Sequence, residues 1–461
     1  MKKKKLRVEK IGGTAMSNFG KIVENVILHD KNDIYNRVYV VSAYGGITND
    51  LLEHKKTGRP GIYKNFKDYK NYKTALIKLK KRLYKINKGF SKIGLNIVEA
   101  NQFIDKRIDS AINILNSMYN VLSSGYLNRN EILLAARELL ASLGEMHSAF
   151  NSANILENQG YNAEFVDLSG WNDSRELTIN ERIANIFSLL DPSKTICFAT
   201  GYAKGTEGIM REFDRGYSEV TFSKVAVLLK ADEAVIHKEY HLCSGDPLII
   251  GEKNIRPVCN TNFDVADQLA DVGMEAIHPK ASKPLEKNDI PIRVKNAFDP
   301  GHEGTLITKE YICPKSKIEI VTGSESVSCI EIHDARMVSE VGFDMEIMQV
   351  LAEYDVSYIC KMTNANTISI VINDKDNKRS MLNKLEKQFE IVTINEVAIV
   401  CTIGSNIAKP GIMAQASTAL AKKKINILAV SQTLRQTNMQ FIIEREDFLK
   451  AQKALHHALC E

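Results

Sequence analysis

The sequence has no long hydrophobic run and lacks the cysteine patterns of disulfide-bonded and zinc-binding proteins. No stretch approaches the roughly 18 apolar residues of a membrane-spanning helix, and the lysines after Met1 lead into no apolar segment of a secretion signal. The eight cysteines are scattered along 461 residues without a C-x-x-C pair, so neither a zinc site nor a disulfide framework is indicated. We therefore expect a cytoplasmic protein with reduced cysteines and no membrane partner.

Common nucleotide and metal motifs are also absent. The chain contains neither the G-x-x-x-x-G-K-[ST] phosphate loop nor the G-x-G-x-x-G fingerprint. The phosphates of a nucleotide would therefore need a different binding loop. His237-Lys238-Glu239-Tyr240-His241 is not the H-E-x-x-H zinc motif, because its acid is displaced by one position. We predict no metal-ligating residues.

The composition is that of an ordinary folded protein, with 44% hydrophobic and 25% charged residues. At about 100–200 residues per domain, the length predicts two to four domains. The net charge of +5 is uneven, since residues 55–92 hold twelve lysines and two arginines against one acid. Tyr72, Leu76, Leu79 and Leu83 recur there at helical spacing, which places the lysines on the solvated face of an amphipathic helix. Because no nucleic-acid motif accompanies them, we expect no nucleic-acid partner.

Predicted strands and helices alternate over the first two thirds of the chain. One strand leads into Gly12-Gly13-Thr14, and the segment 37–41, which is apolar after Arg37, is typical of a strand buried in a parallel sheet. Further strands are predicted at 163–167, 195–199, 233–236 and 292–295, with helices between them. This alternation predicts a three-layer α/β domain.

Beyond residue 314 a shorter pattern occurs twice. Gly342 and Gly411 each precede a helix, and a strand begins 14 residues after each glycine, at Val356 and Ile425. Each copy then adds an alternating strand and another helix. Two tandem α+β modules of βαββαβ type fit this pattern.

Two glycine-containing turns suit an anionic ligand. Lys10-Ile11-Gly12-Gly13-Thr14 ends a strand and opens a helix, where backbone N–H groups and a lysine can hold a phosphate. The segment 42–49, with Ser42 and Thr48, follows the next strand, and loops at the carboxyl ends of neighbouring parallel strands line the ligand crevice. A tight turn at the first segment, and a helix N-cap by Thr48 or Asn49 at the second, are the alternatives without function.

Two further segments suit an amino acid. Glu145 follows Gly144 in a helix rich in leucine and alanine, and its carboxylate can pair with an ammonium group. Arg215-Gly216-Tyr217-Ser218-Glu219 offers a guanidinium fork for a carboxylate, with an acid nearby. Each segment is also compatible with an ordinary surface charge.

Taken in order, these segments resemble those of the aspartokinases of the amino-acid kinase family. Lys10-Ile11-Gly12-Gly13-Thr14-Ala15 is similar to the family's Lys-Phe-Gly-Gly-Thr-Ser element, and Ser142-x-Gly144-Glu145 to its substrate-amine motif. Thr200-Gly201-Tyr202 resembles its Thr-Gly-Phe turn, and residues 215–219 resemble its Arg-Gly-Gly-Ser-Asp motif. The C-terminal repeats resemble paired ACT modules. The resemblance thus implies a catalytic amino-acid kinase domain over residues 1–312 and a tandem ACT-like regulatory domain over 313–461.

The segment that would bind the nucleotide departs most from the family pattern. The usual Thr-Asp reads His237-Lys238, the Asp-Pro-Arg reads Asp246-Pro247-Leu248, and a family lysine is Glu275. This pattern resembles a divergent aspartokinase branch associated with ectoine synthesis genes.

The resemblance implies transfer of the γ-phosphoryl group of ATP to the β-carboxylate of L-aspartate, with Mg²⁺ as the accompanying ion. It makes Lys10 and Glu219 the catalytic residues. The residues implied in substrate binding are Ser42, Ala43, Thr48, Glu145, Tyr202, Arg215 and Ser218. The residues implied in nucleotide binding are Lys10, Gly12, Gly13, Thr14, His237, Lys238 and Asp246. We expect the turn that carries Lys10 and the turn that carries Arg215 to face one another.

The ACT-like pair implies an effector site for lysine or threonine near residues 334–343 and 405–411. It also implies a homodimer or higher homo-oligomer formed through these modules, and modules that only dimerise and stabilise the enzyme are the alternative. Two other functions stay open. One is a kinase for another acidic amino acid, since Glu145 and Arg215 fit any α-amino acid; the other is a non-catalytic amino-acid-binding regulator.

Overall fold

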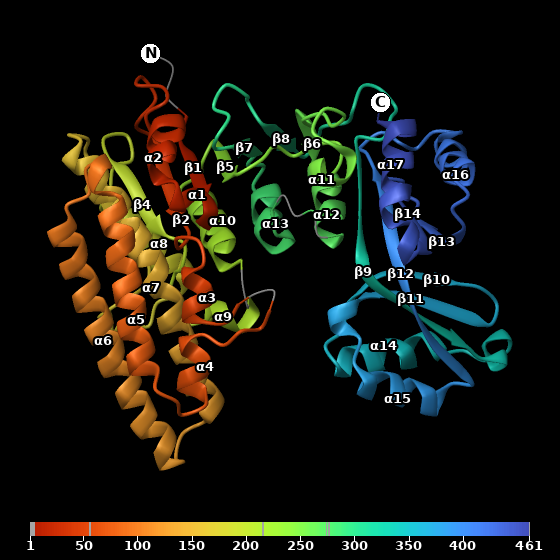
Figure 1. Cartoon of the computed structure of the whole chain (residues 1–461), viewed down its shortest axis with the longest axis horizontal. Coiled ribbons are helices and arrows are strands. Elements are labelled where there is room, and N and C mark those ends of the chain that lie inside the picture. Colours follow the sequence, from red (N-terminus) through yellow and green to blue (C-terminus); the bar gives the residue numbers. More distant parts are fainter. Residues whose placement is uncertain (1–4, 55–56, 214–215, 273, 275–276, 461) are drawn as a thin grey trace. The chain divides into compact units, whose positions relative to one another are not determined.

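The computed structural model describes residues 5–54, 57–213, 216–272, 274 and 277–460 (Figure 1). Its contacts divide the chain into two compact units. The first comprises Met1–His241 and His278–Leu306, and the second comprises Leu242–Ile277 and Ile307–Glu461. The predicted mixed α/β class is confirmed. The predicted boundary at residues 312 and 313 stays a prediction, and the sequence did not indicate that Leu242–Ile277 would group with the C-terminal part.

The first unit is built on a parallel sheet with the strand order β3-β4-β2-β1-β5-β7. The strands are β1 (Arg7–Ile11), β2 (Arg37–Val41), β3 (Ala163–Val166), β4 (Ile196–Thr200), β5 (Glu233–Lys238) and β7 (Ile292–Asn296). β8 (Thr305–Thr308) follows at the boundary between the units. All residues of β2 and β4 are buried, as expected for inner strands of a parallel sheet covered on both faces.

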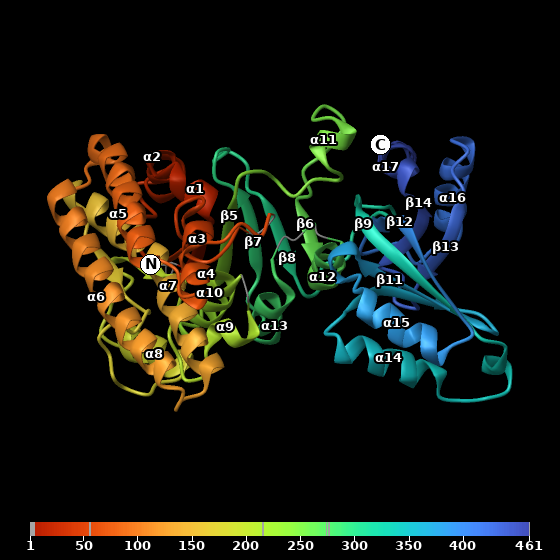
Figure 2. The same cartoon turned by 60° about the horizontal axis from the view of Figure 1, so that its bottom comes forward.

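Helices cover both faces of this sheet. They are α1 (Gly13–Ser17), α2 (Phe19–Ile22) with its π-helical continuation η1 (Val23–Ile27), α3 (Ile47–Leu51), α4 (Ile62–Lys67), α5 (Tyr72–Gly89), η2 (Ser91–Ile93), α6 (Ile97–Ser124), α7 (Arg129–Asn158), α8 (Ile179–Phe187), α9 (Ile209–Glu212), α10 (Tyr217–Leu228) and α13 (Pro279–Lys287). The long helices α5, α6 and α7 lie side by side (Figure 2).

Aromatic contacts show which helices share a face. Phe19 of α2 packs on Phe198, and Phe150 of α7 packs on Phe165. Phe165 and Phe198 are register partners on β3 and β4, so both helices cover the same face. Because successive side chains of a strand alternate, Lys10 of β1 points to the opposite face, where α10 packs against β1, β2 and β5. The predicted three-layer arrangement is therefore present.

The lysine-rich segment forms the amphipathic helix that the sequence predicted. In α5, Tyr72, Leu76, Leu79 and Leu83 are buried, while most of the lysines between them are exposed. Asn71 caps the helix by accepting a hydrogen bond from the backbone N–H of Thr74. The basic character of this segment therefore belongs to a solvated helix face.

The second unit contains a six-stranded antiparallel sheet with the strand order β10-β11-β9-β12-β14-β13. Its strands are β9 (Ile320–His333), β10 (Tyr358–Thr363), β11 (Thr367–Asn373), β12 (Ile391–Ile403), β13 (Ile427–Gln432) and β14 (Asn438–Glu444). Its helices are α14 (Phe343–Glu353), α15 (Arg379–Gln388), α16 (Ile412–Lys422) and α17 (Phe448–Leu459), with the short turns η3 (Ala335–Val338), η4 (Asp374–Asp376) and η5 (Arg445–Asp447). The segment Leu242–Ile277 adds α11 (Pro247–Ile250), β6 (Asn260–Asn262) and α12 (Phe263–Asp271).

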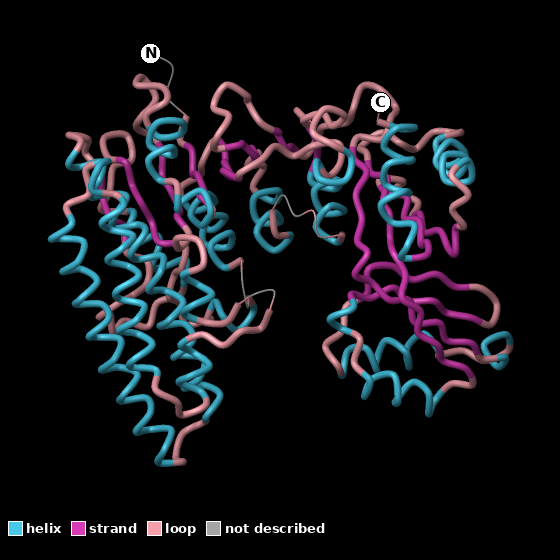
Figure 3. Tube along the Cα trace, in the orientation of Figure 1, coloured by secondary structure: helices cyan, strands magenta, loops and turns pink. Residues whose placement is uncertain are grey.

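Two hydrophobic cores divide this sheet, and both use β9 and β12. Val321, near the start of β9, packs with α16 and α17, whereas Ile330 and Ile332 farther along it pack with α14 and α15. Figure 3 shows the two pairs of helices at different ends of these long strands. The module with α14 and α15 is thus inserted between the first part of β9 and the last part of β12. The sequence predicted successive modules; the structure differs because two strands of 14 and 13 residues are each long enough to serve both cores.

Within the described residues, no helix is both long and apolar enough to cross a membrane.

Close packing of α7 against the loop after β2 predicts the effect of adding a methyl group at Gly144. A Cβ atom there would lie 2.7 Å from Ala43 Cβ and 3.0 Å from Ile47 Cγ2. We expect Gly144→Ala to lower the free energy of urea unfolding by about 1–3 kcal/mol, the usual cost of overpacking. Gly89→Ala is the matched control, because a Cβ atom at that helical glycine meets nothing within 4 Å. Equal stabilities of the two variants would contradict the close contact.

Candidate active site

The turns after β1, β2 and β4 lie together at the carboxyl edge of the first unit's sheet. The backbone N–H of Ser42 donates to the carbonyl of Ile11 at 3.1 Å, and that of Gly201 donates to Val41 at 3.0 Å. Gly13 touches the second turn so closely that a Cβ atom there would lie 2.6 Å from the carbonyl oxygen of Ala43. Three turns far apart in the sequence therefore form one surface, at the edge where such sheets bind ligands.

Lys10 and Glu219 form an ion pair across this edge. Lys10 Nζ donates to Glu219 Oε1 at 2.8 Å, and the backbone N–H of His278 donates to Glu219 Oε2 at 2.8 Å. Burial alone raises the pKa of Glu219, but the charge and hydrogen bond of Lys10, the His278 N–H and the charge of Lys238 bring this pKa down to about 2. Glu219 is therefore ionised. The expectation that the turn with Lys10 faces the turn with Arg215 stays a prediction, because Arg215 lies outside the described residues, whereas Glu219, four residues farther along the chain, contacts Lys10.

Glu145 has the opposite electrostatic character. It is 2% exposed, and its Oε1 accepts a hydrogen bond of 2.5 Å from Ser218 Oγ. Its Oε2 has no hydrogen-bond partner among the residues that the structure describes. Burial raises its pKa to about 8 against the lowering effects of Ser218, Lys10 and the backbone of Tyr202. Without a ligand this carboxyl group is largely neutral at pH 7, with one oxygen left for a cation.

Tyr202 contacts a carboxylate that the sequence did not single out. Its hydroxyl donates to Glu138 Oε2 at 3.2 Å, and the backbone N–H of Met210 donates to Glu138 Oε1 at 3.1 Å. Burial raises the pKa of Glu138. The sequence could have indicated Glu138 through its distance from Glu145. The two residues are seven positions apart and therefore lie on the same face of α7.

The other predicted binding residues of the first two turns border this surface. Ala43 is buried, Ser42 and Thr48 are partly exposed, and Thr14 is exposed in the first turn of α1. Ser148 on α7 fixes the second turn, since its hydroxyl donates to the carbonyl of Ser42 at 2.9 Å. The alternative N-cap by Thr48 or Asn49 is wrong: α3 starts after Gly46, whose φ of 79° is in the left-handed region.

His237 lies on the face opposite Lys10. Its Nε2 is 2.7 Å from Glu9 Oε2, and Arg37 binds the same carboxylate with hydrogen bonds of 2.5 and 2.9 Å. All three side chains are buried. The structure does not bring His237 to the Lys10 cluster, whereas the charge of Lys238 reaches Glu219. A nucleotide contact by His237 stays a prediction.

Three other residues of the sequence-based prediction are not part of this cluster as described. Asp246 belongs to the second unit, where its carboxylate caps α11 by accepting the N–H of Leu248 at 2.8 Å. Arg215 and Glu275 lie outside the described residues. Within the described ranges, no group of three or more histidine, cysteine, aspartate or glutamate side chains is placed to hold a metal ion.

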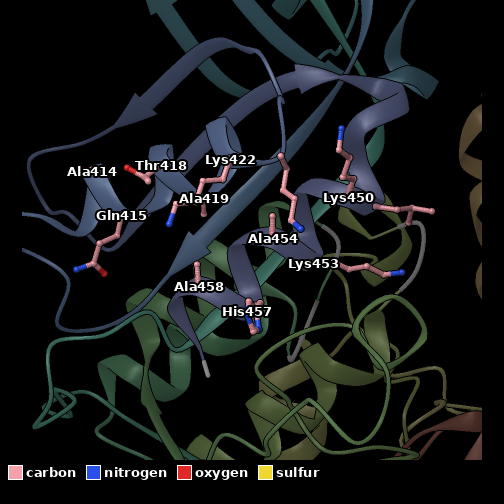
Figure 4. Close-up of a pocket in the computed structure, with 12 residues that line it drawn as sticks. Ala414, Gln415, Thr418, Ala419, Lys422, Lys450, Lys453, Ala454, His457 and Ala458 are labelled. Atoms are coloured by element: carbon pink, nitrogen blue, oxygen red, sulfur yellow. The ribbon is translucent and has the colours of Figure 1, made fainter.

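The second unit has a basic groove between α16 and α17, with a volume of about 1210 Å³ (Figure 4). Its lining includes Lys422, Lys423, Lys450, Lys453 and several alanines, and no carboxylate among the described residues. The groove is separate in sequence from the predicted effector segments 334–343 and 405–411. Those effector positions stay a prediction.

Comparisons with known proteins agree with this arrangement. Residues 5–296 match the amino acid kinase family, and residues 400–459 match an ACT domain. Aspartate kinase Ask_Ect of Stutzerimonas stutzeri is 42% identical over 98% of this chain and 97% of its own length. The chain belongs to the amino acid kinase family. Aspartokinase 1, chloroplastic, of Arabidopsis thaliana is 26% identical over 74% of this chain and 63% of that protein.

Solved structures of this family share the fold. The Clostridium acetobutylicum aspartate kinase has a TM-score of 0.73 at 23% identity, covering 98% of this chain and 100% of that one. E. coli aspartokinase III in complex with aspartate and ADP has a TM-score of 0.71 at 20% identity, covering 99% and 100%.

The raised pKa of Glu145 predicts a pH dependence of stability. The pKa of this group lies at 4.5 in a model compound and at about 8 in the folded protein. A raised folded-state pKa gives stability that is present below 4.5 and lost as the pH rises through about 8. We expect the unfolding free energy of wild type to fall relative to Glu145→Gln, which does not titrate, between about pH 5 and about pH 8 in urea titrations. A difference in unfolding free energy between wild type and Glu145→Gln that stays constant with pH would contradict the raised pKa of Glu145.

Proposed function

We propose that this chain is an aspartate kinase, which transfers the γ-phosphoryl group of ATP to the β-carboxylate of L-aspartate and forms 4-phospho-L-aspartate. One observation carries the proposal. At one sheet edge, a glycine turn with a partly buried lysine, suited to a phosphate, lies near a buried carboxyl group whose second oxygen has no hydrogen-bond partner among the described residues and is suited to an ammonium. The 42% identity to an aspartate kinase over nearly the whole chain supports the same activity.

The chemistry requires two anions to approach. An oxygen of the β-carboxylate forms a bond to the γ-phosphorus while the bond from that phosphorus to the ADP oxygen breaks. Lys10 and the N–H groups of the Gly12-Gly13 turn neutralise the phosphates, since positioning and charge stabilisation provide most of the catalysis in such transfers. No general base is needed, because the accepting carboxylate is ionised at neutral pH.

Aspartate would be held by both positively and negatively charged side chains. Glu145 pairs with the α-ammonium group, and this cation favours the ionised form of Glu145, so that binding releases a proton. Arg215 holds the α-carboxylate, and Ser42 and Thr48 orient the β-carboxylate. Tyr202 and Ala43 line the same pocket.

ATP is the nucleotide of the proposal, and Mg²⁺ would accompany it. Mg²⁺ is usually held by substrate phosphates together with one or two carboxylates. Glu219 fits this requirement, since it is ionised and next to the lysine that faces the phosphates. When bound, the ion would neutralise charge on the β- and γ-phosphates, and Glu219 also holds Lys10 in place.

The product belongs to the aspartate-derived amino-acid pathways or to ectoine synthesis. The resemblance to the ectoine-associated branch is confirmed by Aspartate kinase Ask_Ect as a 42% identical relative. Which pathway uses the product is part of the proposal.

A hydroxylamine-trapping assay tests the activity. With ATP and Mg²⁺ we expect trapped product from L-aspartate and none from other acidic amino acids. Lys10→Ala should lower kcat by about two to three orders of magnitude, as loss of a preorganised charge does. Lys5→Ala, an exposed lysine just before the same strand, is the control and should match wild type. Product from glutamate would favour a kinase for another acidic amino acid, and no product from any substrate would favour a non-catalytic regulator.

We also propose that the ACT-like modules bind lysine or threonine and form a homodimer or higher homo-oligomer. The similarly folded E. coli aspartokinase III was solved in complex with lysine and aspartate. Titration of the activity with lysine and threonine, alone and together, should show inhibition by at least one of them. A flat response to both, with an oligomer in analytical ultracentrifugation, would leave the modules only a dimerising and stabilising role.

A further inference from the structure

Helix α7 carries three carboxylates on one face. Glu131, Glu138 and Glu145 are spaced seven residues apart, which is close to two helical turns. Their partners all come from the part of the chain between the end of β4 and the first turn of α10. Arg211 forms an ion pair with Glu131, Met210 and Tyr202 bind Glu138, and Ser218 binds Glu145. The connection is therefore held along α7 by acidic side chains.

Glu138 differs from Glu131 in what it joins. Its two oxygens accept hydrogen bonds from Tyr202 and Met210, which flank residues 203–209. Tyr202 is 2% exposed, so loss of Glu138 would leave a buried hydroxyl without its partner. The side chains of Glu131 and Arg211 are 52% and 48% exposed, and such surface ion pairs contribute little.

Tyr202 links Glu138 to the proposed aspartate site. Its side chain binds Glu138, its backbone lies close enough to Glu145 to lower the pKa of that carboxyl group, and its ring packs edge-on against Tyr217 at 6.0 Å between centroids. Tyr217 directly precedes Ser218, which also binds Glu145. A shift of Tyr202 would therefore affect Glu145 in two ways, through the Tyr202 backbone and through Tyr217 and Ser218.

We propose that Glu138 is a positioning residue for aspartate: it holds Tyr202 and the first turn of α9 so that Glu145 and Ser218 are set for the substrate. Glu138 itself touches no reacting atom. This inference rests on the proposed function, because it names the residue that organises the amino-acid side of the same site. The phosphate turn at Lys10 is held by other groups, so the effect should be confined to aspartate.

Steady-state kinetics of matched variants test the role. Glu138→Ala should raise the KM for aspartate about tenfold, the effect of losing the two hydrogen bonds of a buried carboxyl group, with the KM for ATP within about twofold of wild type. Glu138→Gln should recover most of the affinity, because its amide can accept from Met210 and donate to Tyr202 Oη. Glu131→Ala, on the same helix face and against the same connection, should stay within about twofold of wild type. Thermal unfolding of each variant checks that it is folded.

Several results would overturn the inference. They are an unchanged aspartate KM in Glu138→Ala, an equal rise in the KM for ATP, or an equal effect of Glu131→Ala. If Glu138→Ala does not fold, a double-mutant cycle of Glu138→Leu with Tyr202→Phe replaces it, and additive effects would then reject the coupling. A wild-type protein without aspartate kinase activity would contradict the proposed function instead, and aspartate affinity by calorimetry would still decide the role of Glu138.

Discussion

The arrangement of the first unit depends on the ion pair between Lys10 and Glu219. It connects the end of β1 with the first turn of α10, and the N–H of His278 completes it. Because Glu219 is ionised and mostly buried, its contact with Lys10 keeps the lysine side chain at the edge of the sheet instead of extending into water. A lysine fixed in this way needs little reorganisation when an anion arrives, which is the condition for electrostatic stabilisation of a transferring phosphoryl group.

Two carboxyl groups near Lys10 are kept in opposite protonation states. The pKa of Glu219 is about 2 because of its direct contact with Lys10, whereas burial raises the pKa of Glu145 to about 8. Environments that separate the pKa values of neighbouring acids are a common mark of functional sites. Here the separation makes the two acids chemically different: Glu219 binds Lys10, whereas Glu145 has a buried oxygen without a hydrogen-bond partner among the described residues.

Helix α7 brings these groups together. Its glycine allows the turn after β2 to approach, Ser148 binds that turn, and its acidic face holds the connection between β4 and α10. One helix therefore positions both the second turn and the Tyr202 segment. In the second unit, the long strands β9 and β12 have the comparable role, because they pass through both hydrophobic cores.

Much of this could be predicted from the sequence. Apolar strands ending in glycine turns, with helices between them, predicted the three-layer α/β unit, and the spacing of Tyr72, Leu76, Leu79 and Leu83 predicted α5. The residue types in each turn indicated anionic and amino-acid ligands, since local charge and glycine content are properties of the chain itself.

Contacts between distant segments could not be predicted, because they depend on strand order and on the direction of each side chain. Only the folded structure decided that Lys10 meets Glu219, that His237 turns to Glu9 and Arg37 on the other face, and that Glu138 holds Tyr202. It also decided that one C-terminal module is inserted in the other. The sequence by itself determined which chemical groups each turn carries; the tertiary structure decided which groups face one another, because burial and long-range pairing set both their contacts and their charges.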